Sequence, residues 1–370
     1  MTKIIREEEQ LDFKDVMIVP TPSTVESRSH TSVVRPYKFM WSGKTIEGNP
    51  AIASNMDCTG TFEMAKELEK HQMFCALSKH YSAEDIIQFL ESNLKDFGTN
   101  DYVFISTGLR GDDFSKLKQI MKTGLCKNIR LDAPNGYIQG FIQHLNRIRH
   151  TFPDAIIMAG NVVTPEKTAE IIQNGADVAV VGIGGGSQCS TRAMTGVGRP
   201  QFSTVLDNVD AAHTAKGMLC SDGGITQPAD YVKAIAAGSD FVMIGGYFAG
   251  CSEAGGQLIR RVIETSEITD EKTGQKRRYI EERKLFYGMS SEYAQNKHYN
   301  GMHQYRASEG IVSLVPYVGP VAKKIQELEG GLRSAMTYTN SKTIDQLQNN
   351  AEFYKVRHQI NRNSKAIEKE

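Results

Sequence analysis

Short, nearly continuous apolar runs alternate with longer amphipathic segments along most of the chain. Continuous apolar runs of this length are typical of parallel strands covered by helices. The runs are residues 51–55 (AIASN), 73–78 (MFCALS), 102–106 (YVFIS), 128–132 (NIRLD), 155–159 (AIIMA), 178–182 (VAVVG), 217–222 (GMLCSD) and 241–245 (FVMIG). The amphipathic segments predict helices, among them residues 61–70, 83–94, 137–150, 165–174 and 228–237.

Eight strands in alternation with helices predict an α/β fold, a (β/α)8 TIM barrel, with an open eight-stranded sheet as the alternative. Pro165 and Pro228 suit the first turns of their helices. We expect one catalytic domain over residues 1–370. Its parts are an N-terminal extension beneath or beside the barrel (1–50), a lid or flap with long mobile loops after the eighth strand (251–319), and a C-terminal helical segment (320–370).

Two segments of the expected lid stand out by composition. The charged stretch 264–284 contains a Thr-Gly pair and predicts a hairpin, either simply solvated or part of a mobile lid. Residues 285–310 are rich in Gly, Ser, Tyr and His and predict a long functional loop. In that loop Glu309 is a candidate general acid or base, and Arg306 is a candidate phosphate or cofactor contact.

Charge and cysteine usage narrow the classes of function. Lys+Arg and Asp+Glu both total 43, so bulk charge gives no support for binding nucleic acid or an anionic membrane. The apolar runs are too short to span a bilayer. The six cysteines show no Cys-x-x-Cys pair and predict reduced thiols in a cytoplasmic protein.

Polar residues follow the predicted strands, where the catalytic groups of a barrel enzyme collect. Asn55 and Asp57 follow the first strand, Lys79-His80-Tyr81 the second, Asp132 the fourth and Asn161 the fifth. Asp222-Gly223-Gly224 follows the seventh strand and Gly245-Gly246 the eighth. Glycine leaves backbone N–H groups unobstructed, so the last two segments predict a phosphate site, with plain tight turns as the alternative.

Cys189 lies in a polar, glycine-rich loop after the sixth strand, within VGIGGGSQCSTRAMTGVGRPQ. A nucleophilic cysteine needs exposed, electropositive surroundings, which Arg192 and local N–H groups could supply. Thr191 could pass protons, although most such threonines only hydrogen-bond a turn. Gly184 and Gly186 could direct carbonyl groups toward a cation, a weak indication on spacing alone.

These segments together resemble the guanosine monophosphate reductase family, within the wider inosine monophosphate dehydrogenase and reductase superfamily. The resemblance covers nearly the whole chain. Its motifs are LDFKDV, NMDCTGTFEMA, KHYS, MAGNVVT, GADVAVVGIGGGSQCSTRAMTGVG, SDGGIT, GSDFVMIGG, LFYGMSS, YRASEG and GGLRSAMTY.

The resemblance implies reductive deamination of GMP to IMP with NADPH and release of ammonia. Cys189 matches the family's nucleophile, which attacks purine C2 and forms a thioimidate. Thr191 and Glu309 match the pair that assists proton transfer to the departing amine. The family is homotetrameric, binds its nucleotide without nucleic-acid or membrane partners, and serves purine nucleotide salvage.

The resemblance also implies three binding sets. The GMP set is Asp222, Gly223, Gly224, Gly245, Gly246, Gly288, Met289, Ser290, Arg306, Ala307, Ser308, Glu309 and Gly310. The NADPH set is Lys79, Asp132, Ala133, Tyr305, Ser334, Ala335, Met336 and Thr337, with Ser27 and Arg28 reaching a neighbouring subunit's cofactor. The monovalent-cation set, usually occupied by K⁺, is Gly184, Gly186, Cys189 and Arg192.

The chain departs from the family pattern at several positions. Gly185 stands where the family usually has proline, and Arg199 where reductases usually have tyrosine. Gln188 and Ser190 replace a small apolar residue and a threonine, and the charged stretch 264–284 is longer than in the common reductases.

Two other functions are weighed against the reductase. An IMP dehydrogenase would use the same cysteine, but the short interval before residue 102 leaves no room for the regulatory CBS domain pair often inserted there. Gly245-Gly246, LFYGMSS and YRASEG are also reductase-like. A silent nucleotide-binding protein would lack the nucleophile and its partners.

Overall fold

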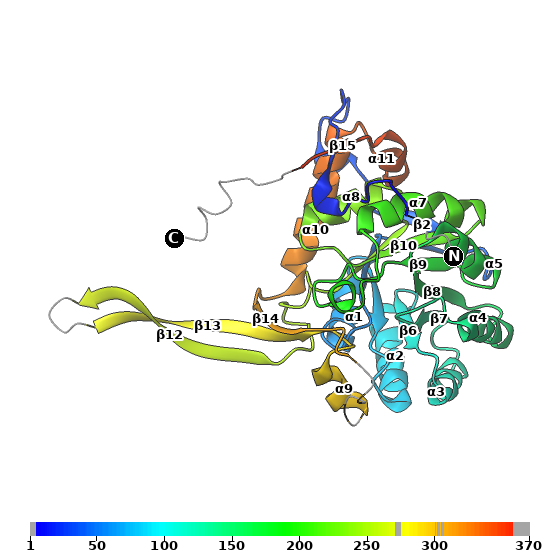
Figure 1. Cartoon of the computed structure of the whole chain (residues 1–370), viewed down its shortest axis with the longest axis horizontal. Coiled ribbons are helices and arrows are strands. Elements are labelled where there is room, and N and C mark those ends of the chain that lie inside the picture. The colour runs from blue at the N-terminus through cyan, green and yellow to red at the C-terminus, as the bar shows by residue number, and fades with distance from the viewer. Residues whose placement is uncertain (1–4, 271–274, 300, 302–303, 305–306, 358–370) are drawn as a thin grey trace.

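The computed structural model describes residues 5–270, 275–299, 301, 304 and 307–357, and a closed barrel of eight parallel strands lies at its centre (Figure 1). Pairing of β11 with β4 closes the barrel, which confirms the predicted TIM barrel and excludes the open sheet. The strands are β4 (Ala51–Ala53), β5 (Phe74–Leu77), β6 (Val103–Thr107), β7 (Asn128–Asp132), β8 (Ile156–Val162), β9 (Val178–Val181), β10 (Met218–Asp222) and β11 (Phe241–Ile244).

Side-chain alternation along each strand divides the core into two layers. In β4, Ile52 points into the barrel, whereas Ala51 and Ala53 face the helices. The inner layer holds Phe74, Phe104, Met158, Val180 and Met243 from other strands. The barrel is therefore a packed core, and only its ends can hold a site.

An outer ring of helices covers the barrel (Figure 1). Its members are α1 (Phe62–Glu69), α2 (Ala83–Phe97), α3 (Gly111–Met121), α4 (Gln139–Thr151), α5 (Pro165–Gln173), α7 (Gln201–Thr214), α8 (Pro228–Ala236) and α10 (Val321–Tyr338). The side chains of Thr61 and Ser82 cap α1 and α2, and the two prolines open α5 and α8 as predicted. In the part of the chain described, no helix combines the length and apolarity that a membrane crossing requires.

A hairpin of the N-terminal extension closes one end of the barrel. The extension contains this hairpin of β2 (Arg35–Lys38) and β3 (Thr45–Gly48) and two short 3-10 turns, η1 (Phe13–Asp15) and η2 (Arg28–His30). The buried Tyr37 ring stacks on Phe241 with centroids 4.4 Å apart and meets Phe74 edge-on. Because Phe74 and Phe241 begin their strands, this plug lies at the N-terminal mouth and leaves the C-terminal mouth for chemistry.

The C-terminal segment is not wholly helical, which corrects the expectation for residues 320–370. After α10 and α11 (Ile344–Asn350), strand β15 (Phe353–Lys355) pairs antiparallel with β1 (Val16–Ile18). The two ends of the described chain therefore hold each other beside the barrel.

The segment after β11 forms a three-stranded sheet of β12 (Leu258–Asp270), β13 (Gln275–Tyr287) and β14 (Val312–Pro316). The β12–β13 hairpin projects far from the barrel (Figure 1) and is longer than predicted, while Thr273 and Gly274 lie outside the described residues. The expected loop 285–310 is partly regular, since it completes β13 and then forms α9 (Glu292–Tyr299). Burial of Phe286 and Tyr287 against Cys58 and Ala294 explains the order at its start.

Candidate active site

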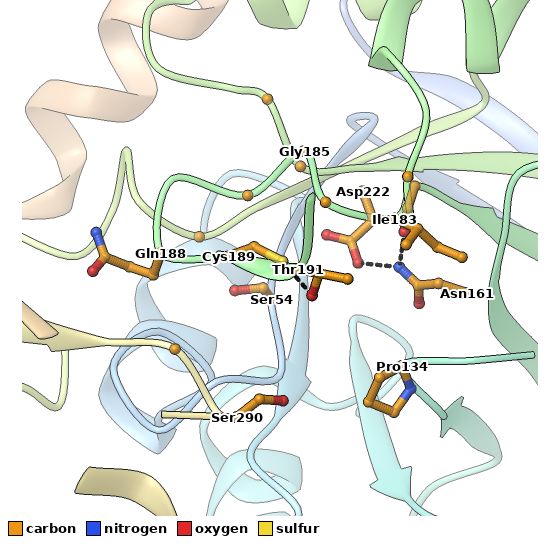
Figure 2. A pocket seen from close by; sticks show the side chains of 18 of the residues that line it. Ser54, Pro134, Asn161, Ile183, Gly185, Gln188, Cys189, Thr191, Asp222 and Ser290 are labelled. Atoms are coloured by element: carbon orange, nitrogen blue, oxygen red, sulfur yellow. Dashed lines mark hydrogen bonds between the residues drawn. The ribbon is translucent and has the colours of Figure 1, made fainter. Parts of the chain in front are cut away.

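A cavity of about 700 Å³ opens at the C-terminal mouth of the barrel. Its walls come from the loops after β9, β10 and β11 and from the turn between β13 and α9 (Figure 2). The sequence-predicted residues that line it are Asp132, Gly184, Gly186, Cys189, Thr191, Asp222, Gly223, Gly224, Gly245, Gly246, Gly288, Met289, Ser290 and Glu309. A volume of this size is in the range that holds a small organic ligand.

A chain of three side chains crosses one wall of this cavity. The Cys189 thiol donates to Thr191 Oγ1 at 3.2 Å, and Thr191 Oγ1 donates to Glu309 Oε2 at 2.9 Å. Backbone contacts fix the spacing, because Ser190 N donates to Glu309 O at 3.0 Å and Cys189 forms a bridge with Gly310. The arrangement joins a nucleophile to a carboxylate through a hydroxyl, which suits proton transfer.

Cys189 differs from the other cysteines in exposure. All six are free thiols, and only Cys189 is exposed. Burial raises the pKa of Cys58 to about 11 and that of Cys126 and Cys251 to about 12. The buried thiols are therefore unreactive at neutral pH, and Cys189 is the one thiol accessible to a ligand among the six.

Close backbone packing joins the three glycine-rich loops. Gly223 has a φ of +99°, and a Cβ there would lie 3.1 Å from the Gly185 carbonyl carbon. A Cβ on Gly246 would lie 2.6 Å from Ser187 Oγ. Side chains at these positions would separate the loops, so the glycines serve both the fold and access to backbone N–H groups.

A charged network lies on the floor of the cavity, across the ends of β5, β7, β8 and β10. Asp132 accepts from Lys79 at 3.3 Å and from Arg130 at 3.4 Å. Arg130 also donates to Asn161 Oδ1 at 2.7 Å, and Asn161 Nδ2 donates to Asp222 Oδ2 at 2.7 Å (Figure 2). The network fixes both carboxylates at the mouth of the barrel.

The two carboxylates of this network differ in their proton affinity. Burial opposes ionisation of Asp132, but the charges of Lys79 and Arg130 outweigh it and lower its pKa. At Asp222 burial is the larger effect and raises the pKa, despite Arg130 and Asn161. Asp222 is half-buried and lines the cavity, so it can hydrogen-bond hydroxyl groups of a ligand.

Other predicted contact residues lie in separate places. Ala307 and Ser308 precede Glu309 beside the Cys189 loop, where the Ser308 carbonyl accepts from Ser190 Oγ at 3.4 Å. Ala133 follows β7 and is held by a backbone bond to Gly160 O at 2.9 Å. The proposed contacts Tyr305 and Arg306 lie outside the described residues.

Six cofactor candidates lie away from the cavity. Ser27 and Arg28 begin η2, which packs against α10, the helix that carries Ser334–Thr337. Arg333 donates to the Thr31 carbonyl and joins the two elements. None of these residues lines the cavity of their own chain.

The residues of the predicted cation set lie close together in the loop after β9 and at the start of the following short helix. Gly186 O accepts from Cys189 N at 3.0 Å, and Arg192 O accepts from Gly196 N at 3.1 Å, where α6 (Thr191–Thr195) ends. Each carbonyl keeps a second lone pair, so the set remains compatible with a cation. The Arg192 guanidinium donates to Arg199 O and pairs with Asp12 at 3.4 Å, so that carboxylate partly balances its charge.

Two residues of the site were not singled out from the sequence. Arg130 is fully buried and links the residues of the charged network on the cavity floor. The sequence feature that could have indicated it is a charged residue within the apolar run NIRLD. Gln201 is also buried and donates to Val181 O at 2.9 Å and to Ser221 Oγ at 3.1 Å, which ties β9 to β10 beneath the glycine loops. A glutamine at a helix start carries no comparable signal.

Comparison with known proteins identifies the family. A family model described as IMP dehydrogenase / GMP reductase domain matches residues 10–366. The chain belongs to the IMP dehydrogenase / GMP reductase family. In this member α2 alone fills the interval between β5 and β6, so no further domain is inserted there.

Individual relatives of this family are similar over nearly their whole length. A protein named GMP reductase from Onchocerca volvulus is 45% identical over 360 residues, covering 96% of this chain and 94% of the relative. GMP reductase 2 from Homo sapiens is 44% identical, covering 95% and 96%. GMP reductase from Citrobacter koseri is 43% identical, covering 97% and 98%.

Proposed function

We propose that this chain is a GMP reductase, which converts GMP and NADPH to IMP, NADP⁺ and ammonium. The observation that carries the proposal is the Cys189–Thr191–Glu309 chain in the wall of a nucleotide-sized cavity. The names of the similar relatives support the same reaction.

The first half of the reaction is the loss of the amine. The Cys189 sulfur adds to purine C2, and the C2–N bond breaks as ammonia leaves, which forms a thioimidate. An amine leaves readily only when it is protonated, and Thr191, hydrogen-bonded to Glu309, would deliver that proton. The thiolate divides one difficult substitution into two easier steps.

The second half replaces the sulfur by hydrogen. Bound NADPH would supply a hydride to C2. The C2–S bond then breaks and returns the electron pair to Cys189. Overall, one hydride and two protons are consumed for each IMP and ammonium formed.

We also propose binding roles for residues around the cavity. The N–H groups of Gly223, Gly224, Gly245 and Gly246 would hold the substrate phosphate, and Asp222 the ribose hydroxyls. Asp132 and Lys79 would bind the nicotinamide end of the cofactor. The carbonyls of the Cys189 loop would hold K⁺, a hard cation that prefers oxygen.

We further propose a homotetramer. Ser27, Arg28, Ser334, Ala335 and Thr337 lie together on a surface away from the cavity of their own chain, whereas Met336 is buried in the core beneath them. They can therefore contact a cofactor only if that surface faces the cavity of a neighbouring subunit.

IMP dehydrogenase activity is the second candidate, because it would use the same cysteine. A paired assay separates the two: GMP with NADPH against IMP with NAD, followed by nicotinamide absorbance and ammonia release. We expect ammonia to appear in step with NADPH loss. Turnover only in the second arm would overturn the reductase proposal.

The covalent step has its own test. Cys189→Ala should bind GMP but show no turnover, and Cys251→Ala, which removes a buried thiol, is the matched control. Persistent turnover by Cys189→Ala would exclude the thioimidate route, whichever of the two reactions the enzyme performs.

A further inference from the structure

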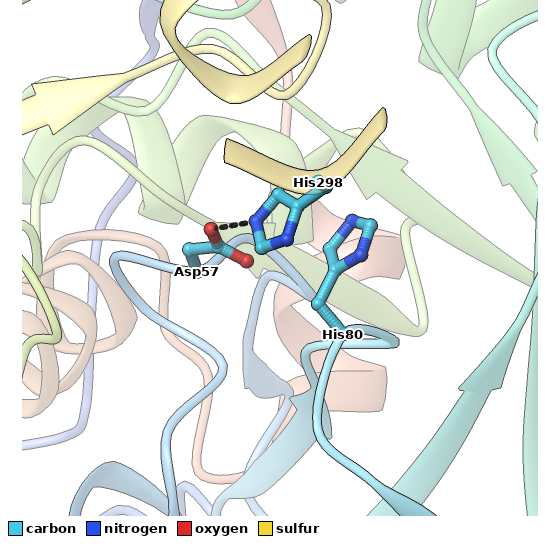
Figure 3. Close-up of side chains that lie close together, drawn as sticks. All are labelled: Asp57, His80 and His298. Atoms are coloured by element: carbon cyan, nitrogen blue, oxygen red, sulfur yellow. Dashed lines mark hydrogen bonds and ion pairs between the residues drawn. The ribbon is translucent and has the colours of Figure 1, made fainter. Parts of the chain in front are cut away.

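A cluster of two imidazoles and a carboxylate lies outside the lining of the cavity. Asp57 follows β4, His80 follows β5, and His298 is in the last turn of α9 (Figure 3). One ligating atom from each lies within 4.8 Å of the others, and within the described residues no other trio of His, Cys, Asp or Glu meets this condition. None of the three lines the cavity, so the proposed reaction does not account for them.

The members of the cluster differ in hydrogen bonding, since Asp57 Oδ1 contacts Ser78 and Asp57 Oδ2 contacts Tyr287, Lys297 and His298. The side chains of His298 and Asp57 are only 14% and 8% exposed. Among the described residues, no hydrogen bond to a ring nitrogen of His80 is formed. An imidazole nitrogen with no protein partner beside an anion is a vacant ligand position.

We propose that Asp57, His80 and His298 form a binding site for a divalent transition-metal cation such as Zn²⁺, joining the barrel to α9. Two nitrogen or oxygen donors at about 2.0–2.1 Å from a tetrahedral zinc ion stand roughly 3.3 Å apart. The Asp57 and His298 donors are 2.5 Å apart, and the His80 and His298 rings are stacked with centroids 3.6 Å apart. Because the lone pair of an imidazole nitrogen lies in the ring plane, binding one ion requires the His80 ring to turn out of its stack on His298. Water would complete the coordination.

The ammonium group of Lys297 would compete with a metal ion for the Asp57 carboxylate. Lys297 Nζ lies 3.1 Å from Asp57 Oδ2 and 3.0 Å from Tyr287 Oη, so its ammonium group neutralises the carboxylate without metal. Its side chain is 49% exposed and can turn to solvent when a cation binds. Metal binding would therefore displace the Lys297 ammonium group from Asp57 and break the His298–Asp57 hydrogen bond.

The test is direct metal binding to the full-length chain carrying Cys189→Ala, which removes the exposed thiol as another ligand. Co²⁺ is the spectroscopic probe, since its visible absorption reports coordination, and Zn²⁺ competes for the site. We expect one Co²⁺ per chain. His80→Asn and His298→Asn should each weaken binding by at least about 10-fold, because loss of even an outer-shell partner weakens metal sites about 10–100-fold.

Two further variants separate a site from incidental histidine binding. Lys297→Met removes the competing charge and should tighten Co²⁺ binding several-fold, an effect that misfolding cannot mimic. His150→Asn, at an exposed histidine on α4, should leave binding unchanged. GMP binding by each variant checks that it is folded. Absence of stoichiometric Co²⁺ binding, or equal loss in His150→Asn, would overturn the proposal.

Discussion

Thr191 donates a hydrogen bond to Glu309 at 2.9 Å although the two residues are 118 positions apart in the chain. The Cys189 thiol contacts the same hydroxyl from the other side at 3.2 Å. The Thr191 hydroxyl thus accepts a hydrogen bond from Cys189 and donates one to Glu309. The site exists only where the segment before β14 packs on the loop after β9.

Removal of the Thr191 hydroxyl should separate binding from chemistry. Thr191→Val keeps the side-chain shape but breaks both hydrogen bonds, so kcat should fall about 10²–10⁴-fold with little change in GMP affinity. Steady-state kinetics with GMP and NADPH measure the effect, and Thr151→Val on α4 is the control. If kcat stays within a few-fold of the original, Thr191 has no role in proton transfer.

Two neighbouring glycines of the Cys189 loop should respond differently to alanine. Gly184 has a φ of +81°, and a Cβ there would lie 2.4 Å from Arg192 Cγ. Gly185 lies outside the left-handed region, and its Cβ would have Gln201 Oε1 at 3.3 Å as its nearest neighbour. Gly184→Ala should therefore lower stability by about 1–3 kcal/mol and impair turnover, whereas Gly185→Ala should be mild. Urea denaturation and kcat compare the pair, and equal effects would contradict the loop geometry.

Arg130 should be essential to stability because it is a fully buried charge with three polar partners, the Leu131 carbonyl, Asp132 and Asn161. Arg130→Met leaves Asp132 and Asn161 without that donor, and we expect a loss of about 3–5 kcal/mol. Arg260→Met breaks an exposed pair with Glu282 and should change stability by less than about 1 kcal/mol. Chemical denaturation measures the free energy of unfolding of both variants. Comparable losses in the two would show that the buried network contributes no more to stability than an exposed ion pair.

The His213–Asp240 contact should make stability depend on pH. A hydrogen bond at 2.8 Å to Asp240 raises the pKa of His213 above its ordinary value. The charged form is therefore favoured in the folded state, so its stabilisation is complete below about pH 6.5 and is lost as pH rises through the raised pKa.

His213→Gln tests this dependence. The variant should differ from the original chain more at about pH 6 than at about pH 9, as read from urea midpoints. A difference that grows with pH would have the wrong sign for this contact.

The eight strands were predictable because their signal is local. Runs such as VAVVG are apolar on both faces, which is what a strand between a barrel interior and a layer of helices requires. Helix starts were equally local, as Pro165 and Pro228 show. The family motifs then placed Cys189, Thr191 and Glu309 as candidates without showing their contacts.

The helix α9 and the pairing of β1 with β15 could not be predicted from local sequence patterns. The helix α9 is mostly polar, so residues 292–299 show no apolar stripe, and tertiary contacts such as the burial of Ala294 stabilise it. The pairing of β1 with β15 joins residues more than three hundred positions apart, and each strand has three residues. Such short segments form strands only when a partner is already in place.

The sequence by itself determined the barrel, the order of its elements and the identity of the exposed-loop cysteine. Tertiary structure alone decided that Glu309 reaches Thr191, that Arg130 links Asp132 to Asn161, and that His298 meets Asp57. The physical reason is that periodicity and capping act over a few residues, whereas these contacts depend on how distant segments pack around the closed barrel.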